Sequence, residues 1–596
     1  MGTLSTTIAP SPHLASMAAM GMMSSCLSGP AVGVVKRTPP SFTVGVKGGR
    51  GHRRNVMLPL SSSSSSSSRM LGSGSAAARS FGGGSRLSTF SLPVSGPRGP
   101  AAAAVDNAGG LGIAEFLGGK NFLITGGTGF LAKGVLIEKI LRTNPDVGRI
   151  YVMIKAKDTE AALKRLQTEV ADTELFKCLR EIHGEEYQAF VARKLVPVVG
   201  DIREANLGIS PELADVIAEE VDIVVNSAGN TNFRERYDVA MDINTLGQFR
   251  IMSFLQRFRR LKLFLHLSTA YVNGQRQGVV LEKPFRLGDS IAKELGSSGS
   301  SDHNAILDIE EEIKLAFNAR RSSYDSASFS QEMKDLGLAR AKVHGWQDTY
   351  VFTKAMGEMV INSMRGEIPV VIIRPSIIES TLKEPFPGWI QGNRMVDPVI
   401  LNYGKGQMTS FLGDPDCVFD VIPADMVVNA TLASMAKHGG GARPGAPSAG
   451  IHVYQVASSA ANPLLYRDLF GFFLEHFTRS PLADAAGRPI PVAPIRFRSS
   501  MEQYARDVEA NALLSRRRAA VEQMLHLGRI YEAYTFYGGR FDGANTAALH
   551  AEMSEEERAA FHLDARGVDW RDYFTNVHIP GLKKHVVKGR GVAGAA

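Results

Sequence analysis

The sequence contains few cysteines: only Cys26, Cys178 and Cys417 occur among its 596 residues. Three cysteines scattered over this length exclude a disulfide framework and a zinc site. We therefore expect no metal ion among the groups that the protein binds.

Long hydrophobic runs are also missing. No stretch reaches 18 consecutive apolar residues, and the apolar segment 464–477 is broken by Arg467, Asp468 and Glu475. A helix that spans a bilayer needs about 20 predominantly apolar residues. We therefore expect no transmembrane helix, although the sequence is compatible with peripheral contact with a membrane.

Acidic residues are absent from the amino terminus. Residues 1–105 contain no Asp or Glu, ten Lys or Arg, and long runs of Ser, Ala and Gly, including eight consecutive serines at 61–68. A basic, serine-rich segment without acids is typical of an organelle transit peptide, and the abundant serine favours a plastid. We expect residues 1–105 to be a disordered plastid transit peptide; the alternative is a solvated tail without a targeting role.

The rest of the chain carries almost no net charge. The whole sequence has a formal charge of +8, but from residue 106 onward 57 Lys and Arg stand against 59 Asp and Glu, which leaves −2. A nearly neutral protein lacks the general electrostatic attraction for nucleic acid. The composition therefore excludes a nucleic-acid-binding function.

From residue 120 onward, apolar runs of strand length alternate with helical patterns. Strands that are buried on both faces read as continuous Val, Ile and Leu runs, and the helices between them provide crossovers. The alternation predicts a doubly wound, parallel Rossmann-type α/β sheet within residues 106–480, with 275–347 as an insertion or lid. Residues 481–596 are expected to form a smaller, mainly helical domain. The strand-like runs are NFLITGGTGF, RIYVMIK, LVPVVGD, VDIVVNSAG, LKLFLHLSTAY, VVIIRPSII and IHVYQVASS.

The segment TGGTGFLAKG follows the first of these runs and opens a helix. Gly126 permits a tight turn, Gly129 lets the backbone approach a pyrophosphate, and Ala132 takes the third small position. The amino terminus of the helix offers free N–H groups to phosphate. The pattern predicts a dinucleotide site that includes Thr125, Gly126, Gly127, Thr128, Gly129, Phe130, Leu131 and Ala132.

Polar or small residues also follow the next three strands. Lys155 follows the second strand, where an NAD-specific site would place a carboxylate, and a lysine suits a 2′-phosphate. NADPH is therefore the expected cofactor. Asp201 after the third strand could accept a hydrogen bond from an adenine amino group. The fourth strand ends on a shelf of small residues, from which Asn226, Ala228 and Gly229 are assigned to the cofactor site.

Candidate catalytic residues follow the fifth strand. Ser268 and Thr269 offer hydroxyls to a substrate carbonyl, and only one of the two is expected to face the site. Tyr350 and Lys354 share one face if their segment is helical, so that Lys354 can lower the pKa of the tyrosine and hold the nicotinamide ribose. His266, in the middle of an apolar strand, is expected to be a core residue.

The phrases TGGTGFLAKG, STAYVNG and YVFTK resemble the extended short-chain dehydrogenase/reductases in order and context. Within that superfamily, the sequence closely resembles the alcohol-forming fatty acyl reductases of the plant plastidial male-sterility-2 type over about residues 115–590. The resemblance includes IIRPSIIESTLKEPFPGWIQG and the ending DWRDYFTNVHIPGLKKHV. It implies that Tyr350 and Lys354 are the catalytic pair and that Thr269, next to Ser268, polarises the carbonyl. It also assigns Arg374 and Pro375 to the cofactor site.

Enzymes of this family reduce a fatty acyl thioester with two NADPH to a primary alcohol, via an aldehyde. The resemblance implies the same reaction here, with a C16 chain on acyl carrier protein or coenzyme A, and the plastid leader favours the former. It also implies a role in lipid precursors of the pollen wall, that is, exine and sporopollenin. The sequence does not predict the oligomeric state.

Two other functions are compatible with parts of the sequence. An NADP-dependent epimerase or sterol-type dehydrogenase on the same fold would explain the cofactor and tyrosine motifs, but not the carboxyl-terminal segment. A non-catalytic NADP-binding module would keep the glycine turn without needing Thr269, Tyr350 and Lys354 together. The joint presence of these three residues favours an enzyme.

Overall fold

The computed structural model describes residues 109–296, 306–323, 327–440, 450–515 and 518–587. The expected transit peptide, residues 1–105, lies outside the described residues. A seven-stranded parallel sheet forms the centre, in the order β11-β7-β5-β4-β1-β2-β3, and confirms the predicted doubly wound fold. Its strands are β1 (Phe122–Thr125), β2 (Ile150–Ile154), β3 (Leu195–Val199), β4 (Ile223–Asn226), β5 (Leu263–Leu267), β7 (Val370–Pro375) and β11 (Ile451–Val456).

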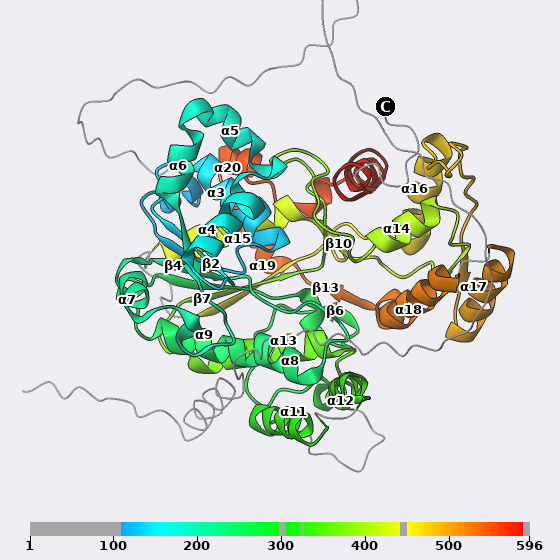
Figure 1. The fold of residues 1–596 in the computed structure, drawn as a ribbon, viewed down its shortest axis with the longest axis horizontal. Coiled ribbons are helices and arrows are strands. Elements are labelled where there is room, and N and C mark those ends of the chain that lie inside the picture. The colour runs from blue at the N-terminus through cyan, green and yellow to red at the C-terminus, as the bar shows by residue number, and fades with distance from the viewer. Residues whose placement is uncertain (1–108, 297–305, 324–326, 441–449, 516–517, 588–596) are drawn as a thin grey trace, which may run out of the picture. The chain divides into compact units, whose positions relative to one another are not determined.

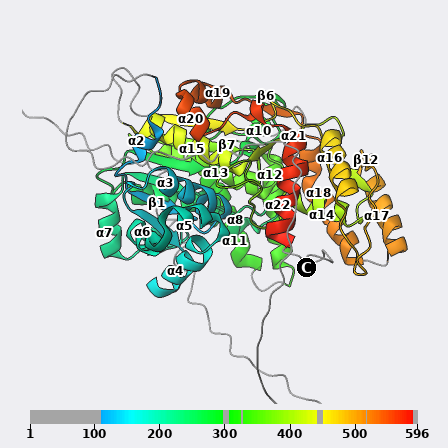
Figure 2. The same ribbon diagram turned by 90° about the horizontal axis from the view of Figure 1, so that it is seen from above.

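Helices cover both faces of this sheet (Figures 1 and 2). Successive side chains of a strand point to opposite faces. On β1, Phe122 and Ile124 therefore join one core and Leu123 joins the other. The first core includes η1 (Phe130–Leu136), α3 (Ile137–Thr143), α4 (Thr159–Leu166), α5 (Lys177–His183), α6 (Tyr187–Lys194) and α15 (Ala424–Gly439). The second includes α7 (Pro211–Glu220), α9 (Gly247–Leu255) and part of α13 (Thr349–Met364).

The strand order reverses between β1 and β4, because the chain leaves β1 toward β2 and β3 and then returns to the other side of β1. In open parallel sheets, such a switch point opens a crevice at the carboxyl ends of the strands, where ligands bind. The predicted cofactor and catalytic residues follow these carboxyl ends. The topology therefore brings residues from distant parts of the sequence to one edge of the sheet.

The predicted insertion, 275–347, contains β6 (Gly278–Val280), α10 (Ile291–Glu294), α11 (Ile309–Ser323) and α12 (Phe329–Val343). Its apolar side chains share a core with α13 and with α8 (Tyr237–Met241). Strand β6 pairs in parallel with β13 (Gly539–Phe541) from the end of the chain. The segment therefore packs beside the helix that carries Tyr350 and Lys354.

The carboxyl-terminal part is mainly helical, as predicted. The periodic stretch 500–537 forms α17 (Met501–Ser515) and α18 (Arg518–Thr535). These two helices pack on each other and on β9 (Ser410–Leu412), and β12 (Arg496–Arg498) pairs with β9. The other elements are α14 (Asp397–Gly404), α16 (Tyr466–Arg479), α19 (Ala544–Ala551), α20 (Glu555–Ala560), α21 (Trp570–Asp572), η9 (Tyr573–His578) and α22 (Ile579–Leu582). None of the helices in the described residues has the length and hydropathy needed to cross a membrane.

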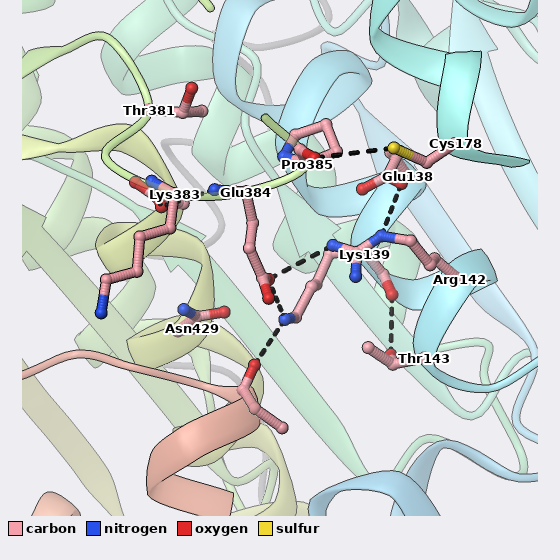
Figure 3. A network of polar contacts seen from close by, with 12 residues as sticks. Glu138, Lys139, Arg142, Thr143, Cys178, Thr381, Lys383, Glu384, Pro385 and Asn429 are labelled. Carbon is pink, nitrogen blue, oxygen red and sulfur yellow. Dashed lines mark hydrogen bonds and ion pairs between the residues drawn. The ribbon is translucent and has the colours of Figure 1, made fainter. Parts of the chain in front are cut away.

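A network of charges fixes the loop after β8 (Ile377–Glu379) against α3 (Figure 3). The Lys139 ammonium is 2% exposed; it binds the Glu384 carboxylate and donates to the carbonyl of Ala560 at 2.6 Å. Arg142 lies 3.2 Å from the same carboxylate, and it also donates to the Glu138 carboxylate at 2.7 Å. Burial raises the pKa of the Glu384 carboxyl, but the two cations outweigh this effect and hold it below its ordinary value.

Replacing Glu384 by Gln should destabilise the protein by about 2–3 kcal/mol, because it leaves the buried Lys139 ammonium without a counter-charge. The free energy of unfolding, measured by urea denaturation, checks this expectation. Glu311→Gln is the matched control: it removes a carboxylate from an exposed ion pair with Lys314 and should cost less than about 0.5 kcal/mol. Equal effects of the two substitutions would contradict the structural role of the network.

Candidate active site

The turn after β1 is closed by glycines that have no room for a side chain. Gly126 has φ +68°, and a Cβ there would lie 2.8 Å from the backbone N of Ala228. A Cβ on Gly127 would lie 2.3 Å from a methyl group of Val152. The Gly129 N–H donates to the Gly126 carbonyl at 2.8 Å and completes the turn. The loop is thus a backbone-lined cradle at the switch point, which fits the pyrophosphate of a dinucleotide.

The other residues of the glycine-rich segment support this cradle. Thr125 is fully buried; its hydroxyl donates to Asn226 Oδ1 at 2.6 Å and accepts from the Ala228 N–H at 3.2 Å. These bonds tie the ends of β1 and β4 together, so Thr125 and the Asn226 side chain shape the crevice through the backbone. Phe130 stacks on Trp389 with ring centroids 5.3 Å apart, and Ala132 is fully buried. Thr128 and Leu131 are partly buried in the same turn, and Gly229 follows Ala228 on the shelf.

Lys155 and Asp201 lie together beyond β2 and β3. The Lys155 ammonium is 3.0 Å from the Asp201 carboxylate, and Arg203 binds the same carboxylate at 2.7 Å. Burial raises the pKa of Asp201, but the hydrogen bonds from Arg203 and Lys155 outweigh it and hold the pKa well below its ordinary value. The predicted acceptor is therefore an ionised carboxylate between two cations. Arg203 was not predicted from the sequence.

Tyr350 and Lys354 lie on helix α13, as the sequence predicts. The helix begins after Asp348, whose carboxylate accepts from the Val351 N–H at 3.0 Å and caps the first turn. The spacing of four residues places both side chains on one face. Burial raises the pKa of the Tyr350 hydroxyl well above its ordinary value, Asp348 raises it further, and a hydrogen bond with Thr269 opposes the shift in part. Tyr350 is therefore a protonated phenol that can donate. The expectation that Lys354 lowers the pKa of the tyrosine is wrong, because burial raises this pKa and the Lys354 ammonium hydrogen-bonds to the end of β5 instead.

Lys354 is held by the end of β5. Its ammonium donates to the Leu267 carbonyl at 2.8 Å and lies 3.0 Å from His266 Nε2. Burial lowers the pKa of Lys354 to about 8, although Glu358 opposes the shift. Burial and the nearby Lys354 lower the pKa of His266 well below its ordinary value, so that its ring is neutral. His266 is a buried core residue, as expected, and it is also a direct partner of Lys354.

The two adjacent hydroxyls after β5 point to different partners. The Ser268 hydroxyl donates to the Glu358 carboxylate at 2.5 Å, and Arg374 binds the same carboxylate through two nitrogens. Glu358 and Arg374 are both fully buried. Thr269 instead lies against Tyr350, and its hydroxyl is 3.5 Å from the Pro375 carbonyl.

These contacts separate the predicted residues into two groups. Ser268 and Arg374 form a buried network behind the site, so neither side chain is free for substrate or cofactor. Thr269 is the hydroxyl beside Tyr350, the predicted catalytic tyrosine. The ambiguity between the two adjacent hydroxyls is thus resolved by where each one hydrogen-bonds in the structure.

An aromatic wall lies over Tyr350 and was not predicted. Phe233 stacks on Tyr350 and on Tyr534, with ring centroids 5.8 Å and 5.4 Å apart, and lies edge-on to Tyr531 at 6.3 Å. Tyr531 and Tyr534 belong to α18, and the Tyr534 hydroxyl donates to the Asp348 carboxylate. Burial raises the pKa of Asp348 to about 6, although the bond from Tyr534 opposes the shift. The carboxyl-terminal helix therefore completes the site.

Two features define the class of protein. One is the doubly wound sheet with a glycine turn at its switch point, and the other is the set of Tyr350, Lys354 and the Thr269 hydroxyl at the same edge of the sheet. The protein is a nicotinamide-dependent oxidoreductase of the short-chain dehydrogenase/reductase type. Two family models, both described as male sterility protein, match residues 124–431, for the NAD-binding part, and residues 515–589.

The relatives are more specific. The chain is 53% identical over 519 residues to fatty acyl-CoA reductase 2, chloroplastic, of Arabidopsis thaliana. The match covers 84% of this chain and 82% of that protein. It is 39% identical over 503 residues to the alcohol-forming fatty acyl-CoA reductase of Simmondsia chinensis, over 80% of this chain and 99% of that protein. The chain belongs to the fatty acyl-CoA reductases of the male sterility protein family. The first relative is named chloroplastic, which agrees with the predicted plastid location.

A solved structure supports the fold alone. The terminal R domain from the myxalamid PKS-NRPS biosynthetic pathway has a TM-score of 0.50 at 17% identity, over 78% of this chain and 91% of that one.

The affinity for the reduced cofactor should fall about tenfold as the pH rises through about 8, because Lys354 then loses the charge with which it is predicted to hold the ribose. Below pH 8 the ammonium is present and the affinity should be constant. Fluorescence titration with NADPH from pH 7 to 9.5 measures the effect. In Lys354→Met the affinity should be low throughout and insensitive to pH; an unchanged pH dependence in this variant would show that another group is responsible.

Proposed function

We propose that the protein reduces a long-chain fatty acyl thioester to a primary alcohol, via an aldehyde, with two molecules of NADPH. The observation that carries the proposal is the juxtaposition of Thr269, Tyr350 and Lys354 beside the glycine turn, under an aromatic wall from α18. Membership of the fatty acyl-CoA reductases supports the substrate class.

NADPH, when bound, supplies the hydride for each step. In the first step, the Thr269 and Tyr350 hydroxyls donate to the thioester carbonyl oxygen as negative charge develops on it. The hemithioacetal then expels the thiol and leaves an aldehyde. In the second step, Tyr350 donates its proton to the alkoxide, which gives the alcohol. Lys354 holds the cofactor ribose and stabilises the transient phenolate that this proton transfer leaves.

The preference for NADPH is attributed to Lys155 and Arg203. Both are partly or largely exposed, with side-chain exposures of 67% and 37%, and both lie beside the end of β2, where the ribose of a dinucleotide is expected. Their positive charges suit a 2′-phosphate. Asp201 orients the two cations and leaves their outer nitrogens available.

The acyl chain is proposed to run from Tyr350 past Phe233 and Tyr531 toward a mainly apolar pocket of about 10 Å³, whose side chains must move apart to admit an alkyl chain. A long alkyl chain gains roughly 0.8 kcal/mol for each buried CH₂, so an apolar path favours long chains, and C16 is the proposed length. The cavity is lined by Val399, Met408, Phe411, Leu412, Tyr504, Leu527, Gly528 and Tyr531.

The proposed setting is the plastid, with residues 1–105 as the transit peptide, 106–480 as the reductase domain and 481–596 as the helical substrate domain. Acyl carrier protein is the proposed thiol carrier, because chains under synthesis in plastids are held on it, and coenzyme A is the alternative. The proposed product serves as a lipid precursor of the pollen wall, as in the family that the sequence resembles.

The function is tested by incubating the purified full chain with NADPH and either palmitoyl-acyl carrier protein or palmitoyl-CoA. We expect hexadecanol, identified by gas chromatography of the extracted lipid, with two NADPH consumed per alcohol and a higher kcat/KM for the acyl carrier protein substrate. NADH in place of NADPH should support a lower rate. Absence of both aldehyde and alcohol with either thioester would refute the reductase proposal.

Three hydroxyl substitutions separate the proposed roles. Tyr350→Phe should lower kcat by about 10²–10⁴-fold, because it removes the general acid, and should leave NADPH binding nearly unchanged. Thr269→Val should lower kcat by about 10²–10³-fold, because it removes a donor to the developing oxyanion. Ser268→Ala is the matched control: it removes the adjacent hydroxyl and should lower kcat only a few-fold. A larger loss in Ser268→Ala than in Thr269→Val would reverse the assignment.

A further inference from the structure

Three ionisable side chains with metal-ligating atoms meet in the interior, away from the residues assigned to the reduction. Glu379 ends β8, Asp397 begins α14 and His578 ends η9, so the three come from separate parts of the sequence. Each is at most 1% exposed. Their ligand atoms all lie within 4.8 Å of one another.

Some of the polar atoms that face one another in this cluster make no hydrogen bonds. His578 Nε2 lies 3.2 Å from Asp397 Oδ1 and 3.8 Å from Glu379 Oε2. Neither His578 Nε2 nor Asp397 Oδ1 makes a hydrogen bond, although both atoms are buried. Ligands at about 2.0–2.1 Å from a tetrahedral ion are about 3.3 Å apart. The 3.2 Å separation matches this spacing and the 3.8 Å separation is wider, so a small shift of Glu379 would close the ligands around an ion.

The charges of the cluster also require compensation. Two carboxylates are buried together, and within the described part of the chain no Lys or Arg forms an ion pair with either of them. An ionised carboxylate without a partner is too costly to bury, so such groups coordinate a metal or take up protons.

Neighbouring groups orient the three side chains toward one another. His578 Nδ1 lies 3.0 Å from the Ser380 hydroxyl, which leaves Nε2 to face the carboxylates. The Arg394 N–H donates to Asp397 Oδ2 at 3.1 Å, so that Oδ1 faces the cluster, and the Val396 N–H donates to Glu379 Oε1 at 3.4 Å. Outer partners that fix the tautomer and rotation of ligands in this way are typical of metal sites.

We propose that Glu379, Asp397 and His578 bind one divalent transition-metal ion, with zinc as the preferred ion. One imidazole nitrogen and two carboxylate oxygens are ligands that suit Zn²⁺, whereas Mg²⁺ and Ca²⁺ prefer oxygen alone. The ion is structural: it connects β8 and α14 to the end of η9 and so fixes the last helices of the chain. This proposal replaces the expectation, drawn from the cysteine count, that no metal is bound; a site of one histidine and two carboxylates needs no cysteine.

The test is the metal content of the full chain, purified without a polyhistidine tag, equilibrated with Zn²⁺ and passed through a desalting column in metal-free buffer. Mass spectrometry of the metals should find about one zinc ion per chain. His578→Ala and Glu379→Gln should each lose most of it. His476→Ala is the matched control, because His476 is also a buried histidine but bonds to the Thr575 carbonyl at 2.7 Å, and it should keep the zinc.

Two further readouts separate a metal site from a merely structural cluster. Cobalt in place of zinc should give the visible absorption of a four-coordinate ion, and His578→Ala should abolish it. A strong chelator should lower the Tm of the wild type and leave the Tm of His578→Ala unchanged. The proposal is overturned if the folded wild type retains no zinc after equilibration, in which case the cluster shares protons, or if Glu379→Gln and His578→Ala retain as much zinc as the wild type.

Discussion

The site depends on one buried ion pair, between Glu358 and Arg374. Glu358 lies on α13 one turn after Lys354, and Arg374 lies near the end of β7. Both are fully buried, and the Ser268 hydroxyl from the end of β5 adds a third bond to the same carboxylate. A buried charge without its partner is costly, so the pair holds its elements in one register. The catalytic helix is thereby fixed against the two strands that it must face.

The pair also explains why two adjacent residues have different tasks. Both partners lie on α13, where Tyr350 and Glu358 are eight residues, about two helical turns, apart. Ser268 bonds to Glu358 and Thr269 lies against Tyr350. The packing of α13 against the end of β5 therefore gives the two adjacent hydroxyls different partners.

Much of the fold could be predicted from the sequence, because its signals are local. Most of the sheet strands are buried, largely apolar runs, the glycine turn is a short motif, and the spacing of Tyr350 and Lys354 is about one helical turn. The contacts that complete the site are not local. His266 meets Lys354 from 88 residues away, and Tyr534 meets Asp348 from 186 residues away. The hydrophobic periodicity of one segment does not predict which distant residue its side chains contact.

The assignment of Arg374 to the cofactor site shows the same limit. An arginine at the end of a parallel strand is in a suitable place to contact a ligand, and the family resemblance assigned Arg374 to the cofactor site. In the structure, its guanidinium is directed at Glu358 and lies over the Phe285 ring at 5.2 Å. Which way a strand-end side chain points depends on the helix packed against it, and this is a property of tertiary structure.

The aromatic residues of α18 join the substrate wall to the catalytic helix. Tyr534 packs against Phe233, which in turn stacks on Tyr350, and its hydroxyl binds the carboxylate that caps α13. The wall and the helix cap therefore share one carboxylate, Asp348. Because Asp348 also raises the pKa of Tyr350, a displacement of Tyr534 would change both the shape of the pocket and the acidity of its proton donor. The carboxyl-terminal helices therefore contact both the proposed proton donor and the wall along which the acyl chain is proposed to run.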